Sequence, residues 1–238
     1  MLEVPLLLLA TCWGLTEIVV TPEEFGAVGD GKANDWIPLK KALSACYLAV
    51  YQVGRDNITA RQPCRVKLSK SYISGPLIIN SSRTTLEVMT GATLSMLDRP
   101  QYEKACPQTG CTFISSAPGA EGCRTVYPNP HSPSDGYKVC LSDVSLTGGG
   151  TIDGRASYDP SSWWLCARLE LKSCWRPKLS EFSSVADLTV GGSLTFKNTP
   201  TGSMRLVGNV RARVSGLTIK GHFPALISLR NFKSSLIA

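Results

Sequence analysis

Three aspartates stand at similar places in a pattern that the sequence repeats. Asp143 begins the run Asp-Val-Ser-Leu-Thr-Gly-Gly-Gly-Thr-Ile-Asp-Gly, Asp153 lies near its end, and Asp187 begins the related run Asp-Leu-Thr-Val-Gly-Gly-Ser-Leu-Thr-Phe-Lys-Asn. Strands stacked about 4.8 Å apart would make some of these carboxylates neighbours, able to share a proton or bind Ca²⁺. Aspartate in a Gly-Thr-Ile-Asp-Gly turn more often accepts backbone hydrogen bonds, so we favour a structural role for Asp153.

Basic residues gather in the last third of the chain. From Leu165 to the end there are eleven Lys and Arg residues against three Asp and Glu, whereas residues 1–164 carry 14 against 15. These side chains could simply solvate the outer faces of strands. They could also attract a polyanion, and by charge alone nucleic acid and acidic polysaccharide fit equally well. The candidate binding residues are Lys197, Arg205, Arg213 and Lys220.

A regular spacing indicates the elements that position these residues. Ile152, Phe196 and Ile219 occupy matching places in short alternating runs, 44 and 23 residues apart, so the first step is close to twice the second. A period in the low twenties, with Val, Leu, Ile and Thr alternation and glycine corners, is typical of a solenoid of strands. The leucine and asparagine ladder of leucine-rich repeats is missing. We therefore predict an all-β fold, a right-handed, single-stranded parallel β-helix with these three side chains in one inward column.

The rest of the chain fits one such domain. A helix is predicted over Asn34–Val50, with Asn34 or Asp35 as its cap and Pro38 in its first turn, and it would cover the open N-terminal end of the core. Further strands are predicted at residues 65–69, 72–79 and 85–96. Residues 98–138 and 155–180 interrupt the pattern and are expected to be excursions from the coils.

Cysteine usage and the N-terminus favour an oxidising compartment. Residues 1–20 have an apolar core of signal-peptide length, although a buried first strand is the alternative. Removing them leaves eight of the nine cysteines, an even number that could pair fully. Zinc is a weaker alternative because no Cys-x₂-Cys pair exists. The candidate disulfide cysteines are Cys46, Cys64, Cys106, Cys111, Cys123, Cys140, Cys166 and Cys174, and the candidate glycosylation sites are Asn57 and Asn80.

Several fragments, in order, resemble the polygalacturonases of glycoside hydrolase family 28. The fragments are Phe25-Gly-Ala-Val-Gly-Asp-Gly-Lys32, Gly150-Thr-Ile-Asp-Gly154, Trp163-Trp164, Arg176-Pro177, Leu194-Thr-Phe-Lys-Asn198 and Gly216-Leu-Thr-Ile-Lys220. The resemblance covers residues 21–220, which would form the β-helix domain, and leaves 221–238 as a divergent tail. It implies a pectin lyase-like β-helix and inverting hydrolysis of galacturonan in carbohydrate metabolism, a reaction that needs one carboxylic acid and one carboxylate base.

The family's catalytic motifs are missing from this sequence. No Asn-Thr-Asp exists, no two aspartates are adjacent, and the downstream histidine lies in Gly221-His222-Phe223 instead of Gly-His-Gly. We therefore expect the chain to be the N-terminal part of such an enzyme, inactive as written, with no catalytic residue, metal or cofactor assigned. The alternatives are a non-catalytic secreted β-helix that binds acidic polysaccharide, and a truncated gene product with little function.

The expected setting follows from the same resemblance. The partner would be pectin or polygalacturonate, with no nucleic acid and no membrane involved. We expect a monomer that is secreted into the extracellular space, with the cell wall as its site of action.

Overall fold

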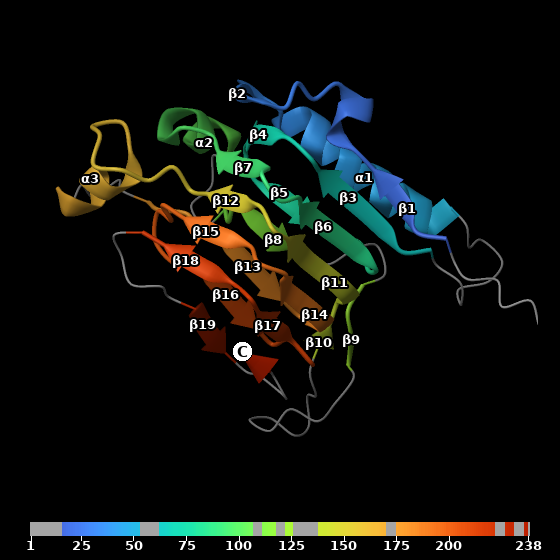
Figure 1. Cartoon of the computed structure of the whole chain (residues 1–238). Helices are drawn as coiled ribbons and strands as arrows, with labels where there is room; N and C mark the ends of the chain where they lie inside the picture. Colours follow the sequence, from blue (N-terminus) through green and yellow to red (C-terminus); the bar gives the residue numbers. More distant parts are fainter. Residues whose placement is uncertain are drawn as a thin grey trace, which may run out of the picture.

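The structure is a computed structural model and describes residues 16–52, 62–106, 111–117, 122–125, 138–169, 175–221, 227–230 and 236–237. Most of the strands belong to three sheets, which we name A, B and C, and all strand pairs within them are parallel. Each full coil gives one strand to each sheet in turn. The colours in Figure 1 accordingly run from blue at one end of the stack to red at the other. The fold is a parallel β-helix, as predicted.

The strands have the following bounds. Sheet A contains β1 (Ile18–Val20), β3 (Cys64–Leu68), β6 (Thr84–Val88), β11 (Leu141–Gly148), β14 (Val185–Gly191), β17 (Arg213–Ser215) and β20 (Leu236–Ile237). Sheet B contains β2 (Asp30–Asn34), β4 (Ser71–Ser74), β7 (Thr93–Met96), β12 (Thr151–Asp153), β15 (Thr195–Lys197) and β18 (Thr218–Lys220). Sheet C contains β5 (Leu77–Ile79), β8 (Ile114–Ser116), β13 (Ser180–Ser183), β16 (Met204–Val207) and β19 (Ile227–Arg230).

The predicted inward column exists in sheet B. Ile152 pairs with Phe196, and Phe196 pairs with Ile219. Ile152 and Phe196 are fully buried, while Ile219 is partly buried and packs against the same core. Tyr72 and Leu94 continue the column toward the N-terminal coils. The 44-residue step between Ile152 and Phe196 is a single coil, enlarged by the excursion between β12 and β13.

Glycine makes the bend from sheet A to sheet B. Gly148 ends β11 with φ +121°, and a Cβ there would lie 1.9 Å from the backbone oxygen of Val88 in the preceding coil. Gly192, one coil later, has φ +95°. Because L-residues with a side chain rarely adopt these angles, and no space exists at Gly148, glycine lets successive coils turn without separating.

The N-terminal helix begins two positions later than predicted. Helix α1 spans Trp36–Gln52, follows the 3₁₀ turn η1 (Pro22–Phe25), and packs on β1, β3, β4 and β5. Its buried residues include Leu39 and Cys46. Asn34 Oδ1 accepts a hydrogen bond from the Trp36 amide at 3.1 Å. The Asp35 carboxylate instead accepts from the amides of Val28 (2.8 Å) and Gly29, so it holds the glycine-rich turn.

The excursions have more structure than the sequence indicated. Residues 98–138 were expected to lie outside the coils, but β8 within them is a full member of sheet C. Around it lie helix α2 (Arg99–Ala105) and the antiparallel pair β9 (Arg124–Thr125) and β10 (Lys138–Val139). The second excursion carries helix α3 (Trp163–Arg168).

Most of the predicted cysteines are disulfide-bonded. The structure pairs Cys46 with Cys64, Cys106 with Cys111, and Cys123 with Cys140. Cys166 is also disulfide-bonded, and Cys174 lies outside the described residues.

The ends of the β-helix differ from the expected boundaries. Strand β1 joins sheet A ahead of the boundary expected at residue 21, and its Val20 is buried. Strands β19 and β20, from the expected tail, pair with β16 and β17. Residues 1–15 and Asn57 lie outside the described part, and Asn80 is half-buried after β5. None of the described helices is both long and apolar enough to cross a bilayer.

Candidate functional site

Both helical excursions connect a strand of sheet B to the following strand of sheet C. Helix α2 lies between β7 of sheet B and β8 of sheet C, and α3 lies between β12 and β13. In Figure 1 both helices project beyond the same edge of the stack. The bend from sheet B to sheet C is therefore built up beyond the regular coils by these two helices.

The outward face of sheet C carries a small charged group. Ile78, Ser115, Glu181, Arg205 and Ser228 follow one another in register across five coils. The Glu181 carboxylate lies 3.3 Å from Arg205 Nη1. It also lies 3.2 Å from the amine of Lys178 on the preceding turn. One half-buried carboxylate thus holds two cations at the surface, which leaves a net positive charge.

A cleft lies beside this face, at the bend between sheets B and C. It has a volume of about 460 Å³ and is lined by residues 98–99, part of 153–164, and Asn198. Asp98 follows β7, Asp153 ends β12 and Asn198 follows β15, so three successive coils contribute to it. Since equivalent strand ends stack in a β-helix, residues far apart in sequence converge here.

Asp153 holds the turns of two coils together. Its Oδ1 accepts hydrogen bonds from the Arg155 amide (2.9 Å) and from Asn198 Nδ2 (3.0 Å). Its Oδ2 lies 3.2 Å from the Lys197 amine. The side chain is only 14 % exposed, and both oxygens are engaged. The structural role favoured from the turn motif is what the contacts show.

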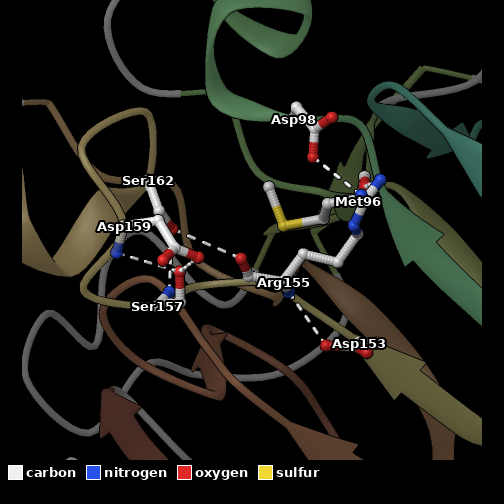
Figure 2. A network of polar contacts seen from close by, with 7 residues as sticks. All are labelled: Met96, Asp98, Asp153, Arg155, Ser157, Asp159 and Ser162. Carbon is white, nitrogen blue, oxygen red and sulfur yellow. Dashed lines mark hydrogen bonds and ion pairs between the residues drawn. The ribbon is translucent and has the colours of Figure 1, made fainter.

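Arg155 extends from this turn to the preceding coil, as Figure 2 shows. Its guanidinium lies 2.8 Å from Asp98 Oδ1 and donates a long hydrogen bond, 3.4 Å, to the Met96 backbone oxygen. Arg155 has φ +51°, a left-handed conformation that costs about 1 kcal/mol for a residue with a Cβ. The Asp98 side chain remains 56 % exposed, so part of its carboxylate faces solvent at the cleft.

The far wall of the cleft is a hydrogen-bonded loop. Ser157 Oγ donates to the Asp159 carboxylate at 2.6 Å, and the Ser157 amide donates to Ser162 Oγ at 2.8 Å (Figure 2). Ser162 Oγ donates in turn to the backbone oxygen of Arg155 at 3.3 Å. The loop therefore holds Asp159 at an exposed position over the cleft.

Aromatic side chains support both walls. Tyr102 of α2 packs edge-on against Trp163 of α3, with ring centroids 5.9 Å apart, and stacks on Trp175. Burial raises the pKa of Tyr102 well above its usual value, so this side chain stays neutral. Trp164 donates from Nε1 to the Thr199 backbone oxygen at 2.9 Å. The centroid of the exposed Tyr158 ring lies 5.5 Å from that of the Trp164 ring. The two helices are thereby fixed relative to the coils.

The arrangement suits binding of a polar, extended ligand. The cleft and its rim offer two exposed carboxylates, Asp98 and Asp159, together with the Arg155 guanidinium and an aromatic surface at Tyr158. A few placed polar groups beside aromatic surface are the usual make-up of a ligand site. Across the described ranges, no group of three or more His, Cys, Asp or Glu side chains is placed to hold a metal ion.

The structure distributes the four predicted cations over all three sheets. Lys197 and Lys220 are neighbours in sheet B, Arg205 lies on sheet C, and Arg213 lies on sheet A. Only the two lysines are brought together. Of the three aspartates, Asp143 and Asp187 occupy equivalent places in β11 and β14, and Asp153 lies in a different sheet.

Sequence reasoning missed Asp98, Arg155 and Glu181. A usable signal existed for Asp98, because it follows a predicted strand just as Asn198 does, and strand ends stack in a β-helix. Glu181 could not be found in this way, because no strand was predicted over residues 180–183, directly after the excursion expected at 155–180.

Comparison with known proteins gives the fold of the chain. The sequence matches no model of a protein family, and it matches no curated protein. Among solved structures, a family 28 exopolygalacturonase from Yersinia enterocolitica aligns with a TM-score of 0.66 at 16% identity, over 93% of this chain and 43% of that one. A candidate glycosyl hydrolase from Parabacteroides merdae aligns with a TM-score of 0.65 at 14% identity, over 92% and 83%. This chain has their fold.

A polygalacturonase from Erwinia carotovora is more distant. Its TM-score is 0.51 at 16% identity, over 93% of this chain and 65% of that one. The chain therefore spans less than two thirds of the length of both polygalacturonases. The structural neighbours are family 28 polygalacturonases and related β-helix proteins, as the sequence resemblance implied.

Proposed function

We propose that this protein is a secreted, polygalacturonase-like β-helix that binds acidic polysaccharide across the outward face of sheet C and the adjoining cleft. The observation that carries the proposal is the group of two cations around Glu181, placed beside a rigid polar cleft. The partner that we propose is pectin or polygalacturonate. The polygalacturonase neighbours support this choice because they share the fold.

The charges give a specific mode of recognition. Lys178 and Arg205 have side chains 34 % and 30 % exposed, so both can reach a ligand while they contact Glu181. A uronate carboxylate would form charge-assisted hydrogen bonds with them, which are about twice as strong as neutral ones. In the cleft, Asp98 and Asp159 would accept hydrogen bonds from sugar hydroxyls.

Binding is better supported than hydrolysis. Inverting hydrolysis needs an acid and a base on opposite sides of one sugar. Within the described strands of sheet C, Glu181 is the one carboxylate on the outward face, and two cations already engage it. The absence of Asn-Thr-Asp and of an aspartate pair from the sequence points the same way. Hydrolysis of galacturonan is the second candidate, favoured by the likeness to the exopolygalacturonase fold.

The disulfides support an extracellular setting. Such bonds form and persist in oxidising compartments, and seven described cysteines are bonded here. Secretion, action at a cell wall and a monomeric state remain parts of this proposal.

Titration calorimetry with trigalacturonate tests the proposal. The Lys178→Gln/Arg205→Gln variant should bind roughly tenfold or more weakly, because each charge-assisted bond contributes about 1.5–3 kcal/mol. Glu181→Gln should bind at least as tightly as the wild type, because it frees both cations. Lys41→Gln, an exposed change on α1, is the matched control, and maltotriose the neutral one. Equal affinity of the wild type and the double variant would refute the proposed surface.

A further inference from the structure

Four charged residues form a column along sheet A. Arg83, Asp143, Asp187 and Arg211 come from successive coils, and all have φ between 54° and 59°. Asp143 and Asp187 lie between the paired residues Ser142↔Ala186 and Val144↔Leu188, so they are equivalent positions. Four rungs separated by about 4.8 Å give the column a length of about 14 Å.

Hydrogen bonds and ion pairs connect the residues of this column to neighbouring coils and to one another. The Arg83 amide donates to the Ser142 backbone oxygen, and the Asp187 amide donates to the Val210 backbone oxygen. Arg211 Nε donates to Asp187 Oδ1 at 2.6 Å, and its Nη2 donates to Oδ2. Arg83 Nε lies 3.9 Å from Asp143 Oδ2, and Asp143 is 64 % exposed. The charges along the column thus run positive, negative, negative, positive.

A groove lies over this column. Its volume is about 620 Å³, larger than that of the cleft at sheets B and C, and Arg124 of β9 and Arg213 of β17 also line it. The groove therefore has four arginines and two aspartates, a net charge of +2. Both Arg124 and Arg213 are exposed, and within the part of the chain that the structure describes neither forms an ion pair. Both guanidiniums line the groove, where an anion could contact them.

We propose that the sheet A groove is a second binding site for a polyuronate, separate from the cleft. Arg124 and Arg213 would bind carboxylates of the polymer, and the exposed oxygens of Asp143 would accept hydrogen bonds from the hydroxyls between them. The two aspartates in the middle of the column favour this ligand over DNA, because a DNA backbone places phosphates but no hydroxyl donors opposite them. The proposal extends the polysaccharide-binding function to another face but depends on different residues.

Titration calorimetry with tetragalacturonate tests the groove. The wild-type isotherm should require two sites, and Arg124→Gln/Arg213→Gln should lose one of them, with at least a tenfold rise in its Kd. The Lys178→Gln/Arg205→Gln variant should lose the other, so failure of one site is distinguishable from failure of the other. Lys41→Gln is the control, and unchanged thermal melting shows that each variant is folded.

Three outcomes would overturn the groove site. The first is a wild-type isotherm that Arg124→Gln/Arg213→Gln leaves unchanged. The second is inorganic sulfate that binds the groove as tightly as tetragalacturonate, which would reduce it to a site for any small anion. The third is oligodeoxythymidylate that binds more tightly than tetragalacturonate, and loses this affinity in the same variant, which would assign the groove to nucleic acid.

Discussion

Asp153 shows how one side chain serves a whole bend of the β-helix. It ends β12, caps the following turn through the Arg155 amide, and holds Asn198 of the next coil. The same position could have been read as catalytic, because carboxylates repeat in this pattern. The contacts explain why it is not free to act: every oxygen already accepts a hydrogen bond or pairs with a cation.

Replacing Asp153 should therefore destabilise the fold. Asp153→Ala leaves the Arg155 amide and Asn198 Nδ2 without their acceptor, at a cost of about 1–3 kcal/mol in the free energy of unfolding. Asp153→Asn keeps one acceptor oxygen and should cost less. Urea unfolding of the three proteins measures both differences. If Ala and Asn are equally tolerated, the hydrogen bonds at Oδ1 do not stabilise the bend.

Asp187 should make stability depend on pH in the acid range. Its hydrogen bond from Arg211 lowers the pKa of the carboxyl below its usual value near 3.8. A lowered folded pKa gives stability that is present above the unfolded pKa and is lost as the pH falls through the folded pKa. Asp187→Asn keeps a residue type that tolerates positive φ but removes this ionisation.

The melting temperatures of wild type and Asp187→Asn, measured from pH 7 to pH 2, test this account. The wild type should melt higher at neutral pH, and the difference should shrink below about pH 4. Arg211→Gln should behave like Asp187→Asn. A difference that stays constant over this range would show that the ion pair contributes nothing.

The sequence identified the candidate basic residues but not the sheet on which each of them lies. Charge alone could not show that Lys197, Arg205 and Arg213 lie in three different sheets. Placement in a β-helix depends on which short strand belongs to which sheet. A one-residue change of register moves a side chain between the core and the surface.

At the scale of elements, the regular parts of the coils were predictable and the excursions were not. Ile152, Phe196 and Ile219 were correctly placed in one column because alternation and spacing act together. Strand β8 was missed because its three residues follow a segment rich in proline and cysteine, where no alternation can be seen. Its pairing is set by β5 and β13 on either side, which is information from the tertiary fold.

The inward column of sheet B predicts that two adjacent substitutions in β15 differ clearly in their effect on the free energy of unfolding. Phe196→Ala removes a fully buried ring and should lower the free energy of unfolding by about 3–5 kcal/mol. Thr195→Ala, on the neighbouring half-exposed position of β15, should change it by no more than about 0.5 kcal/mol. Denaturant unfolding separates the two. A small effect of Phe196→Ala would mean that the stacked column is not the main source of stability in this coil.

At the scale of the whole molecule, disulfides fasten the segments that depart from the regular coil. Cys46–Cys64 joins α1 to β3 across 18 positions, and Cys123–Cys140 closes the segment that holds β9 and β10. A loop of this length stabilises a fold by about 3 kcal/mol when it is closed by a disulfide.

Two measurements examine this. Cys46→Ser/Cys64→Ser should unfold about 3 kcal/mol more easily than the wild type. Thiol titration of the denatured protein, purified from the secreted fraction, should find no free thiol. Two or more reactive thiols in that material would contradict the oxidised state.

The most direct test of the account is a reducing-sugar assay with polygalacturonate and the purified 238-residue chain. Uniform binding of substrate and transition state does not raise the chemical rate, and the described face of sheet C has no acid and base pair. We therefore predict no release of reducing ends above the protein-free blank at concentrations where calorimetry shows the ligand bound. Turnover that survives purification and disappears in Glu181→Gln or Asp153→Asn would contradict the account.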